Sequence, residues 1–229
     1  MSGCPLGICD GSGFVEDEAT RTARPCRCRA QLISRRKARQ LSAVIPRRFK
    51  DVSFDRNPVA QMPDVVVRPI RAYLRSLDEN LDAGRGLWLF GEVGTGKTTL
   101  AMLVAKAALE AGRSVAIYSM PRLLNEIRRT YDEGSDSSYI ELLDRLAEVD
   151  LLHLDDVGAE KTSPWVLEQL YAIVNARYEA QRSMTITTNL GLEQLVEQIG
   201  DRTVSRLKEM CELLPLHGRD QRPYLEHSA

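Results

Sequence analysis

The sequence predicts an α/β fold in which a parallel sheet carries helices on both faces. Three observations predict this class. Short apolar runs typical of buried strands alternate with longer segments of helical periodicity. A glycine-rich turn, GEVGTGKTT at residues 91–99, joins one such strand directly to a helical segment. Two acids, Asp155 and Asp156, end another apolar strand, and open α/β sheets bind ligands at the carboxyl ends of their strands.

The N-terminal part of the chain precedes the predicted sheet. Residues 1–29 are predicted to form a small cysteine-bearing module, and a helical pattern follows over residues 30–43. Ile45-Pro46 ends that pattern, and residues 47–64 are predicted to be loop. We therefore divide the chain into an N-terminal cysteine-rich, basic and helical module, residues 1–44, and a main domain, residues 45–229.

The main domain alternates helices with strands. An amphipathic helix over residues 68–82 leads into a strand at 86–90, and the glycine-rich turn opens a helix over 98–111 that Gly112 ends. Pro121 and the pair Ser163-Pro164 signal two further helix starts, because proline fits the first helical turn and serine caps it. The other predicted elements are strands at residues 114–119, 151–155, 184–189 and 212–216, helices at 121–131, 139–147 and 164–181, and short helices from 192 and 202.

Composition limits the class of protein. The 229 residues are 43% hydrophobic, enough for one sizeable core with a small appendage. No apolar run reaches membrane-spanning length and residues 1–13 lack a signal-peptide pattern, so we expect a soluble cytoplasmic protein with no membrane partner. In that compartment the five cysteines are expected to be thiols or metal ligands rather than disulfides.

The glycine-rich turn has the Walker A pattern of a phosphate-binding loop. Its glycines let backbone N–H groups turn toward phosphate oxygens, and the N-terminus of the next helix adds partial positive charge. Lys97 is expected to contact the β and γ phosphates, and Thr98 to ligate Mg²⁺. We therefore expect ATP or ADP to be bound by Gly91, Glu92, Val93, Gly94, Thr95, Gly96, Lys97, Thr98 and Thr99.

Three further patterns suit phosphate chemistry. Asp155 and Asp156 fit a Walker B strand, with Asp155 holding Mg²⁺ largely through water and Asp156 orienting and deprotonating the attacking water. Asn189 ends the strand at 184–189, where its amide could hydrogen-bond the γ-phosphate or the water, although alone it is equally an ordinary strand end. Arg202 and Arg206 share one helix face, and the planar fork of arginine matches phosphate oxygens.

A basic segment covers residues 21–50. It holds 11 Lys or Arg and no acid, whereas the rest of the chain holds 20 basic against 32 acidic residues. Such a segment suits nucleic-acid phosphates or an acidic partner surface, and a solvated basic helix is the alternative. If it binds single-stranded DNA, the residues expected to meet phosphates are Arg35, Arg36, Lys37 and Arg39.

Four cysteines stand near the N-terminus in two pairs, Cys4 with Cys9 and Cys26 with Cys28. Together they could supply four thiolates to one tetrahedral Zn²⁺. The single residue between Cys26 and Cys28 is shorter than the usual gap of two, so independent reduced thiols are the alternative. Cys211 lies in an apolar setting and is expected in the core.

Taken in this order, the motifs resemble the DnaC/DnaI-type bacterial helicase loaders and the related IstB transposition ATPases of the AAA+ superfamily. The stretches that carry the resemblance are IPRRF at 45–49, the Walker A loop, LDDVGAE at 154–160, TTN at 187–189, GDRTVSRL at 200–207 and GRDQR at 218–222. The resemblance implies a P-loop AAA+ three-layer sandwich with a five-stranded parallel sheet in the order 5-1-4-3-2. In that order the strand at 184–189 lies between the two Walker strands.

The same resemblance implies roles for single residues. Asn189 would lie beside the γ-phosphate as sensor 1, Arg206 would be the arginine finger given to a neighbouring subunit, and Arg222 would contact nucleotide as sensor 2. Asp156 stands where AAA+ proteins generally have glutamate, whose side chain is one methylene longer, so slow hydrolysis is expected. Seven residues follow Arg222, too few for the C-terminal helical lid of most AAA+ proteins. The expected catalytic residues are Lys97, Asp155, Asp156, Asn189 and Arg206.

Three functions compete on these grounds. The first is an ATPase that loads a ring-shaped, DnaB-type replicative helicase onto single-stranded DNA, with slow hydrolysis stimulated by self-association, DNA or the partner. The second is an IstB-like helper that acts with a transposase on duplex DNA, which the cysteine-bearing module disfavours. The third is a small-molecule P-loop kinase, which Asn189 and Arg206 disfavour. We expect the first.

Overall fold

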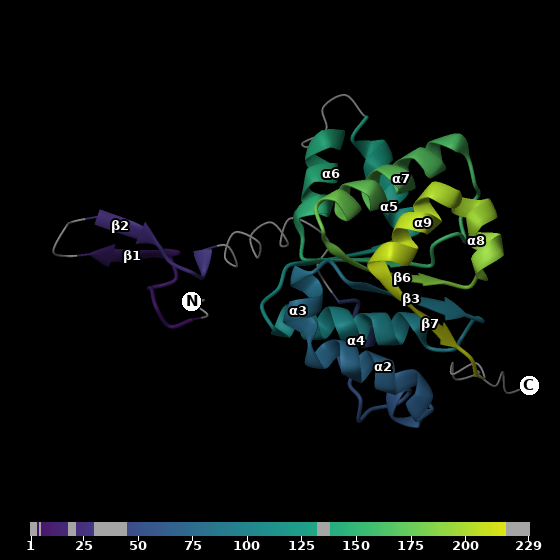
Figure 1. Ribbon diagram of the computed structural model, residues 1–229, viewed down its shortest axis with the longest axis horizontal. Helices are drawn as coiled ribbons and strands as arrows, with labels where there is room; N and C mark the ends of the chain where they lie inside the picture. The colour runs from purple at the N-terminus through teal and green to yellow at the C-terminus, as the bar shows by residue number, and fades with distance from the viewer. Residues whose placement is uncertain (1–3, 5, 18–21, 30–44, 132–137, 219–229) are drawn as a thin grey trace, which may run out of the picture.

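The computed structural model describes residues 4, 6–17, 22–29, 45–131 and 138–218 (Figure 1). They contain two sheets. A small antiparallel sheet pairs β1 (Phe14–Asp17) with β2 (Thr22–Pro25). The main sheet is parallel and consists of β3 (Gly86–Gly91), β4 (Val115–Ser119), β5 (Leu151–Asp155), β6 (Ser183–Thr188) and β7 (Cys211–Leu216). The helix expected over residues 30–43 falls outside the described residues.

The main sheet has the strand order β4-β5-β6-β3-β7. Counted from β3 along the chain, this is the expected order 5-1-4-3-2, and the prediction is confirmed. β6 lies between β3 and β5, with Leu87 of β3 opposite Thr185 and Leu151 of β5 opposite Ser183. The carboxyl ends of β3, β5 and β6 therefore meet at one edge of the sheet.

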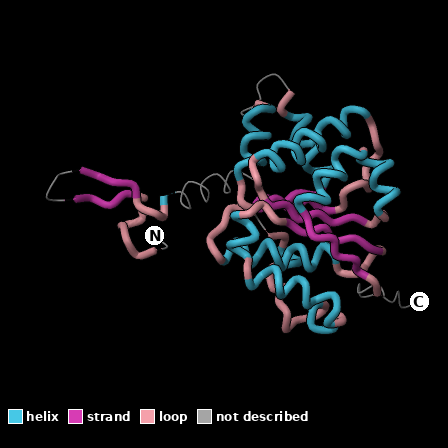
Figure 2. Tube along the Cα trace, in the orientation of Figure 1, coloured by secondary structure: helices cyan, strands magenta, loops and turns pink. Residues whose placement is uncertain are grey.

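Helices cover both faces of the main sheet, which gives the expected three layers (Figures 1 and 2). Successive strand residues face opposite sides, so Trp88 enters one hydrophobic cluster while Leu87 and Leu89 enter the other. The Leu87 side packs against α2 (Asp64–Arg75), α3 (Leu77–Asp82) and α4 (Lys97–Glu110). The Trp88 side packs against α5 (Met120–Arg129), α6 (Tyr139–Glu148), α7 (Pro164–Glu179), α8 (Leu192–Ile199) and α9 (Asp201–Met210). Cys211 is buried, as expected.

Two local predictions were wrong and one hairpin was missed. The helix expected over residues 68–82 starts at Asp64, where Pro63 accepts the first backbone hydrogen bonds, and α2 accommodates Pro69 inside it. It is divided at Ser76, whose φ of −112° and ψ of 36° are not helical. The segment 47–64, expected as loop, contains the 3-10 turns Arg47–Phe49 and Val59–Gln61. The β1–β2 hairpin was missed, because its four-residue strands lack the alternating buried face that marks a strand in sequence.

Among the described residues, no helix combines the length and apolar character that a membrane crossing requires.

Arg177 joins three elements at the edge of the sheet opposite the glycine-rich turn. Its side chain is fully buried and donates hydrogen bonds to the backbone oxygens of Leu146, Val149, Asp150 and Ser183. Burial lowers the pKa of Arg177 to about 9. The acceptors lie at the C-terminal end of α6 and at the starts of β5 and β6, where carbonyl groups lack partners within their own element. One guanidinium group thus fixes how these segments enter the core.

Replacing this side chain should destabilise the domain strongly. Arg177→Met removes the donors and leaves buried carbonyl oxygens unsatisfied, so the free energy of unfolding should fall on the order of 3 kcal/mol or more. Denaturant unfolding of the parent and the variant measures this loss in the free energy of unfolding. The control is Arg182→Met, because the half-exposed Arg182 side chain reaches Asp150 at 3.2 Å and should contribute below about 1 kcal/mol. Equal losses in the two variants would contradict the role of Arg177.

Candidate nucleotide-binding site

The glycine-rich turn lies between a strand and a helix: Gly91 ends β3 and Lys97 begins α4. Gly96 has a φ of 92°, in the region that favours glycine. A Cβ at Gly91 would lie 2.1 Å from the backbone oxygen of Leu216 on β7. The Lys97 ammonium donates to the backbone oxygens of Gly91 at 2.8 Å and Glu92 at 2.7 Å. The loop therefore curls around the Lys97 side chain, whose ammonium group binds backbone oxygens of the loop itself.

The expected magnesium ligands are in direct contact. Thr98 Oγ1, on the first turn of α4, donates to Asp155 Oδ1 at 2.9 Å, and Thr187 Oγ1 of β6 donates to the same oxygen at 2.7 Å. Hydroxyl and carboxylate oxygens are the hard ligands that Mg²⁺ prefers, and it usually takes one or two from protein and keeps several waters. Thr98 and Asp155 thus fit a magnesium ion bound alongside a triphosphate.

Opposing effects act on the pKa of Asp155. Burial by itself would raise the pKa of this carboxyl, but His153 and the hydrogen bonds from Thr187 and Thr98 together lower it below its usual value. His153 is fully buried, and its Nδ1 lies 3.0 Å from the Thr185 backbone oxygen, as a core residue would. Its Nε2 lies 3.6 Å from Asp155 Oδ1 and has no hydrogen bond. His153 is therefore a core residue whose second ring nitrogen faces the Asp155 carboxylate.

Asp156 and Asn189 also meet. Asn189 Nδ2 donates to Asp156 Oδ1 at 2.9 Å, and the Asp156 backbone N–H donates to Thr187 Oγ1 at 2.9 Å. Asp156 has a φ of 63°, a left-handed conformation that is uncommon for a residue other than glycine and often marks functional sites. Thr187 therefore holds both acids, one through its hydroxyl proton and one through its oxygen.

These residues line a cavity of about 520 Å³. Among the expected residues, the lining includes Gly94, Gly96, Lys97, Thr98, Thr99, Asp155, Asp156 and Asn189. Glu92 and Val93 are exposed and, like Gly91, are not among the lining residues, and the Thr95 hydroxyl donates to the Glu92 backbone oxygen at 2.9 Å.

Sequence reasoning missed two parts of this cavity. One wall is the segment preceding α2, which supplies Arg48, Phe49, Asp51, Val52, Arg56, Asn57 and Pro58. Its first residues belong to the stretch IPRRF, whose resemblance to the loader family could have signalled a site role. The other is Thr187, two residues before Asn189 on the strand between the Walker strands, a position from which it reaches both acids.

Arg206 lies away from this cavity, on α9. Its guanidinium group lies over the rings of Tyr171 and Tyr178, at 4.9 and 5.4 Å from their centroids, and reaches the Arg202 backbone oxygen at 3.5 Å. Two aromatic faces restrict how a guanidinium can point. Arg222 lies outside the described residues. The four N-terminal cysteines gather in a cluster of their own, described below.

The sequence model of the IstB-like ATP binding protein family matches residues 29–224. The chain belongs to this family. The resemblance drawn from the motifs is thereby confirmed, and the strand-loop-helix and Asp155 geometry gives this IstB-like protein the P-loop AAA+ architecture expected of it.

Several known proteins are similar to this IstB-like chain. An uncharacterised Escherichia coli protein, YdaV, is 30% identical over 134 residues, covering 58% of this chain and 53% of YdaV. The Escherichia coli replicative helicase loader DnaC is 29% identical over 139 residues, covering 60% of this chain and 55% of DnaC. A crystal structure of the DnaC helicase loader superposes with a TM-score of 0.65 at 29% identity, covering 75% of this chain and 100% of that one. The chain thus spans about half the length of the curated relatives it matches.

Proposed function

We propose that this IstB-like protein is an ATPase that loads a ring-shaped replicative helicase onto single-stranded DNA. The likeness to the helicase loader DnaC, in sequence and in three-dimensional structure over the nucleotide-binding core, carries the proposal. The supporting geometry is the contact set at the carboxyl ends of β3, β5 and β6, which suits binding and hydrolysis of ATP.

In this proposal each group acts on a different part of the triphosphate. The loop backbone and Lys97 bind the phosphates, with the Lys97 ammonium exchanging its two carbonyl acceptors for phosphate oxygens. Thr98 and Asp155 would hold Mg²⁺, which neutralises charge on the β and γ phosphates. Asp156 orients the attacking water and accepts its proton, while Asn189 holds the carboxylate at 2.9 Å.

In this proposal Arg206 is the finger that stabilises charge developing on the transferred phosphoryl group. Arg206 does not line the cavity of its own chain. We assign it to the cavity of a neighbouring subunit, so that self-association completes the site. Arg222 is assigned to nucleotide contact as sensor 2, on the resemblance alone.

The basic segment is assigned to DNA. Among its described residues, Arg47 and Arg48 are exposed and Arg48 lines the cavity, so positive charge borders the proposed nucleotide site. Arg35, Arg36, Lys37 and Arg39 lie outside the described residues, and their contact with DNA phosphates rests on charge alone. The second candidate function, an IstB-like helper of a transposase on duplex DNA, is favoured by the family match itself.

A loading assay separates the two functions. Purified protein is mixed with ATP, circular single-stranded DNA coated with single-strand-binding protein, and the replicative helicase of the same organism. We expect helicase-dependent unwinding of an annealed strand to rise several-fold over helicase alone, and Lys97→Ala to abolish the increase. Absence of stimulation, together with capture of a transposase by the tagged protein, would replace the loader by the transposition helper.

A further inference from the structure

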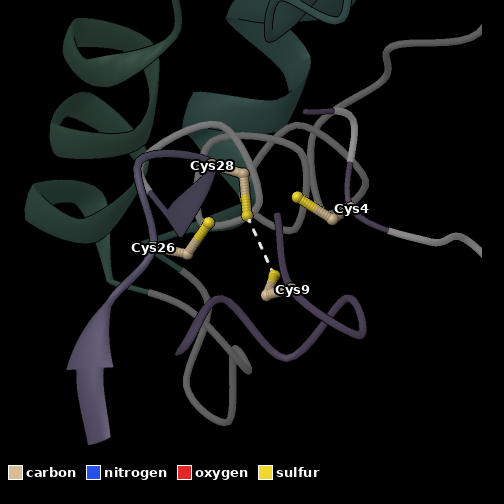
Figure 3. A group of neighbouring side chains, drawn as sticks. All are labelled: Cys4, Cys9, Cys26 and Cys28. Carbon is tan, nitrogen blue, oxygen red and sulfur yellow. Dashed lines mark hydrogen bonds between the residues drawn. The ribbon is translucent and has the colours of Figure 1, made fainter. Parts of the chain in front are cut away.

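A second chemical centre lies in the N-terminal module. The Sγ atoms of Cys4, Cys9, Cys26 and Cys28 all lie within 4.8 Å of one another, and Figure 3 shows the side chains converging from the loop that precedes β1 and the turn that follows β2. The Sγ atoms of Cys9 and Cys28 are 3.5 Å apart. No other group of three or more His, Cys, Asp or Glu side chains among the described residues gathers in this way.

The sulfur positions fit a metal better than disulfides. In a tetrahedral site with Zn–S bonds of about 2.3 Å, the sulfurs lie about 3.8 Å apart, which is within the range found here. A disulfide requires about 2.05 Å between the two sulfurs, and all five cysteines are free thiols in the structure. Four sulfurs converging on one point, rather than two separate pairs, is the arrangement that a single ion requires.

The burial pattern indicates what the cluster is for. Among the described residues 4–29, only Gly13, Cys26 and Cys28 are buried, whereas the apolar side chains of Leu6 and Ile8 are 48% and 50% exposed. Sulfur atoms therefore occupy the place of a hydrophobic core. An isolated two-stranded hairpin is marginally stable at best in water, and modules this small usually need a disulfide or a metal.

The backbone and charges around the cluster suit thiolates. The Ile8 backbone N–H points at Cys4 Sγ, 3.4 Å away, and the Arg29 N–H donates to the Cys26 backbone oxygen at 2.9 Å, which closes the turn that carries Cys28. A zinc ion with four thiolates has a net charge of −2. Arg27 and Arg29 flank Cys28 in sequence. The guanidinium carbon of Arg29 lies 4.2 Å from the ring centroid of Phe14, the first residue of β1.

We propose that Cys4, Cys9, Cys26 and Cys28 bind one structural zinc ion that holds the β1–β2 hairpin together. The four thiols release their protons to solvent as the ion binds, and the closed four-sulfur set leaves no open position for a substrate. Of the two interpretations left open by the sequence, the convergence of the sulfurs favours the metal over independent thiols.

The proposal is tested on the full-length protein purified without chelator. Elemental analysis should give one zinc per chain, and cobalt substitution should give the visible bands of tetrahedral cobalt thiolate. The double variant Cys26→Ser with Cys28→Ser should lose the metal. The matched control is Cys211→Ser, a buried cysteine on β7, which should keep one zinc. Nucleotide binding by the Cys26→Ser, Cys28→Ser protein should match the parent, which shows that the ATPase domain is folded.

Thiol counting under denaturing conditions separates the alternatives. With chelator and without reductant, the zinc protein should yield all five thiols of the chain. Five thiols with neither zinc nor bound cobalt would leave independent thiols and overturn the site. Fewer than five would indicate disulfides and overturn it equally. A zinc content unchanged by the double substitution would place the ion elsewhere.

Discussion

Mixing two inactive variants, Arg206→Ala and Lys97→Ala, should restore ATPase activity. The first keeps an intact phosphate loop and lacks the finger, and the second keeps the finger and lacks the phosphate-binding lysine. If Arg206 acts on a neighbouring subunit, each interface that pairs a good loop with a good finger becomes active. In a random mixture of equal amounts, about a quarter of the interfaces pair an intact loop with an intact finger, because in head-to-tail assembly each interface joins the loop of one subunit to the finger of the next.

Arg206→Ala alone should lose activity by about a thousandfold or more, since the finger stabilises charge that develops on the transferred phosphoryl group. Lys97→Ala alone should be inactive because it loses nucleotide binding. Arg202→Ala is the matched control, because Arg202 lies one turn earlier on α9 and is exposed. It should retain hydrolysis. A mixture with no activity, combined with full activity of dilute monomer, would remove Arg206 from catalysis and leave its stacking on Tyr171 and Tyr178 as packing. If Arg202→Ala is inactive and Arg206→Ala is active, the finger is Arg202, one turn earlier on α9.

Asp156→Asn should bind ATP with parental affinity and hydrolyse it at least about a hundredfold more slowly, because an amide cannot accept the proton of the attacking water. The substitution isolates this chemistry. Asn tolerates the left-handed φ of 63° as well as Asp does, and its amide oxygen can still accept the hydrogen bond from Asn189 Nδ2. Fluorescent-nucleotide titration and single-turnover hydrolysis measure the two quantities separately.

The control for this substitution is Asp156→Glu, which keeps a carboxylate and supplies the methylene that most AAA+ proteins have. It should hydrolyse ATP at or above the parental rate. Parental turnover by Asp156→Asn would show that another group takes the proton. Loss of ATP binding would show instead that Asp156 shapes the loop rather than the chemistry.

The strands that carry the glycine-rich turn and the two acids were predictable because they follow from local patterns. An apolar run that ends in a glycine-rich turn or in two acids can be recognised within a few residues, and β3 and β5 appear where those patterns place them. The strand order came from resemblance, since no local pattern indicates that β6 enters between β3 and β5.

What the sequence did not reveal depends on contacts between distant segments. The wall contributed by Arg48, Phe49 and Asn57 exists only because that segment folds against the cavity, and its polar, proline-broken sequence is typical of any loop. The same holds for Arg177, whose acceptors lie 27 to 31 residues earlier and six residues later in the chain. The spacing of the four N-terminal cysteines was ambiguous in sequence, since only the folded turn brings Cys28 to 3.5 Å from Cys9.

The position of β6 has a consequence for the order of events during synthesis. Both Walker motifs have been synthesised once β5 is made, yet β3 and β5 do not pair with each other, because the strand that separates them is made almost thirty residues later. Thr187, which holds both acids, arrives with that same strand. A nascent chain therefore carries the two sequence signatures of an ATPase before it can assemble a pocket. Closure of the sheet is a long-range step, slow compared with helix formation, and nucleotide can stabilise only the chain that has completed it.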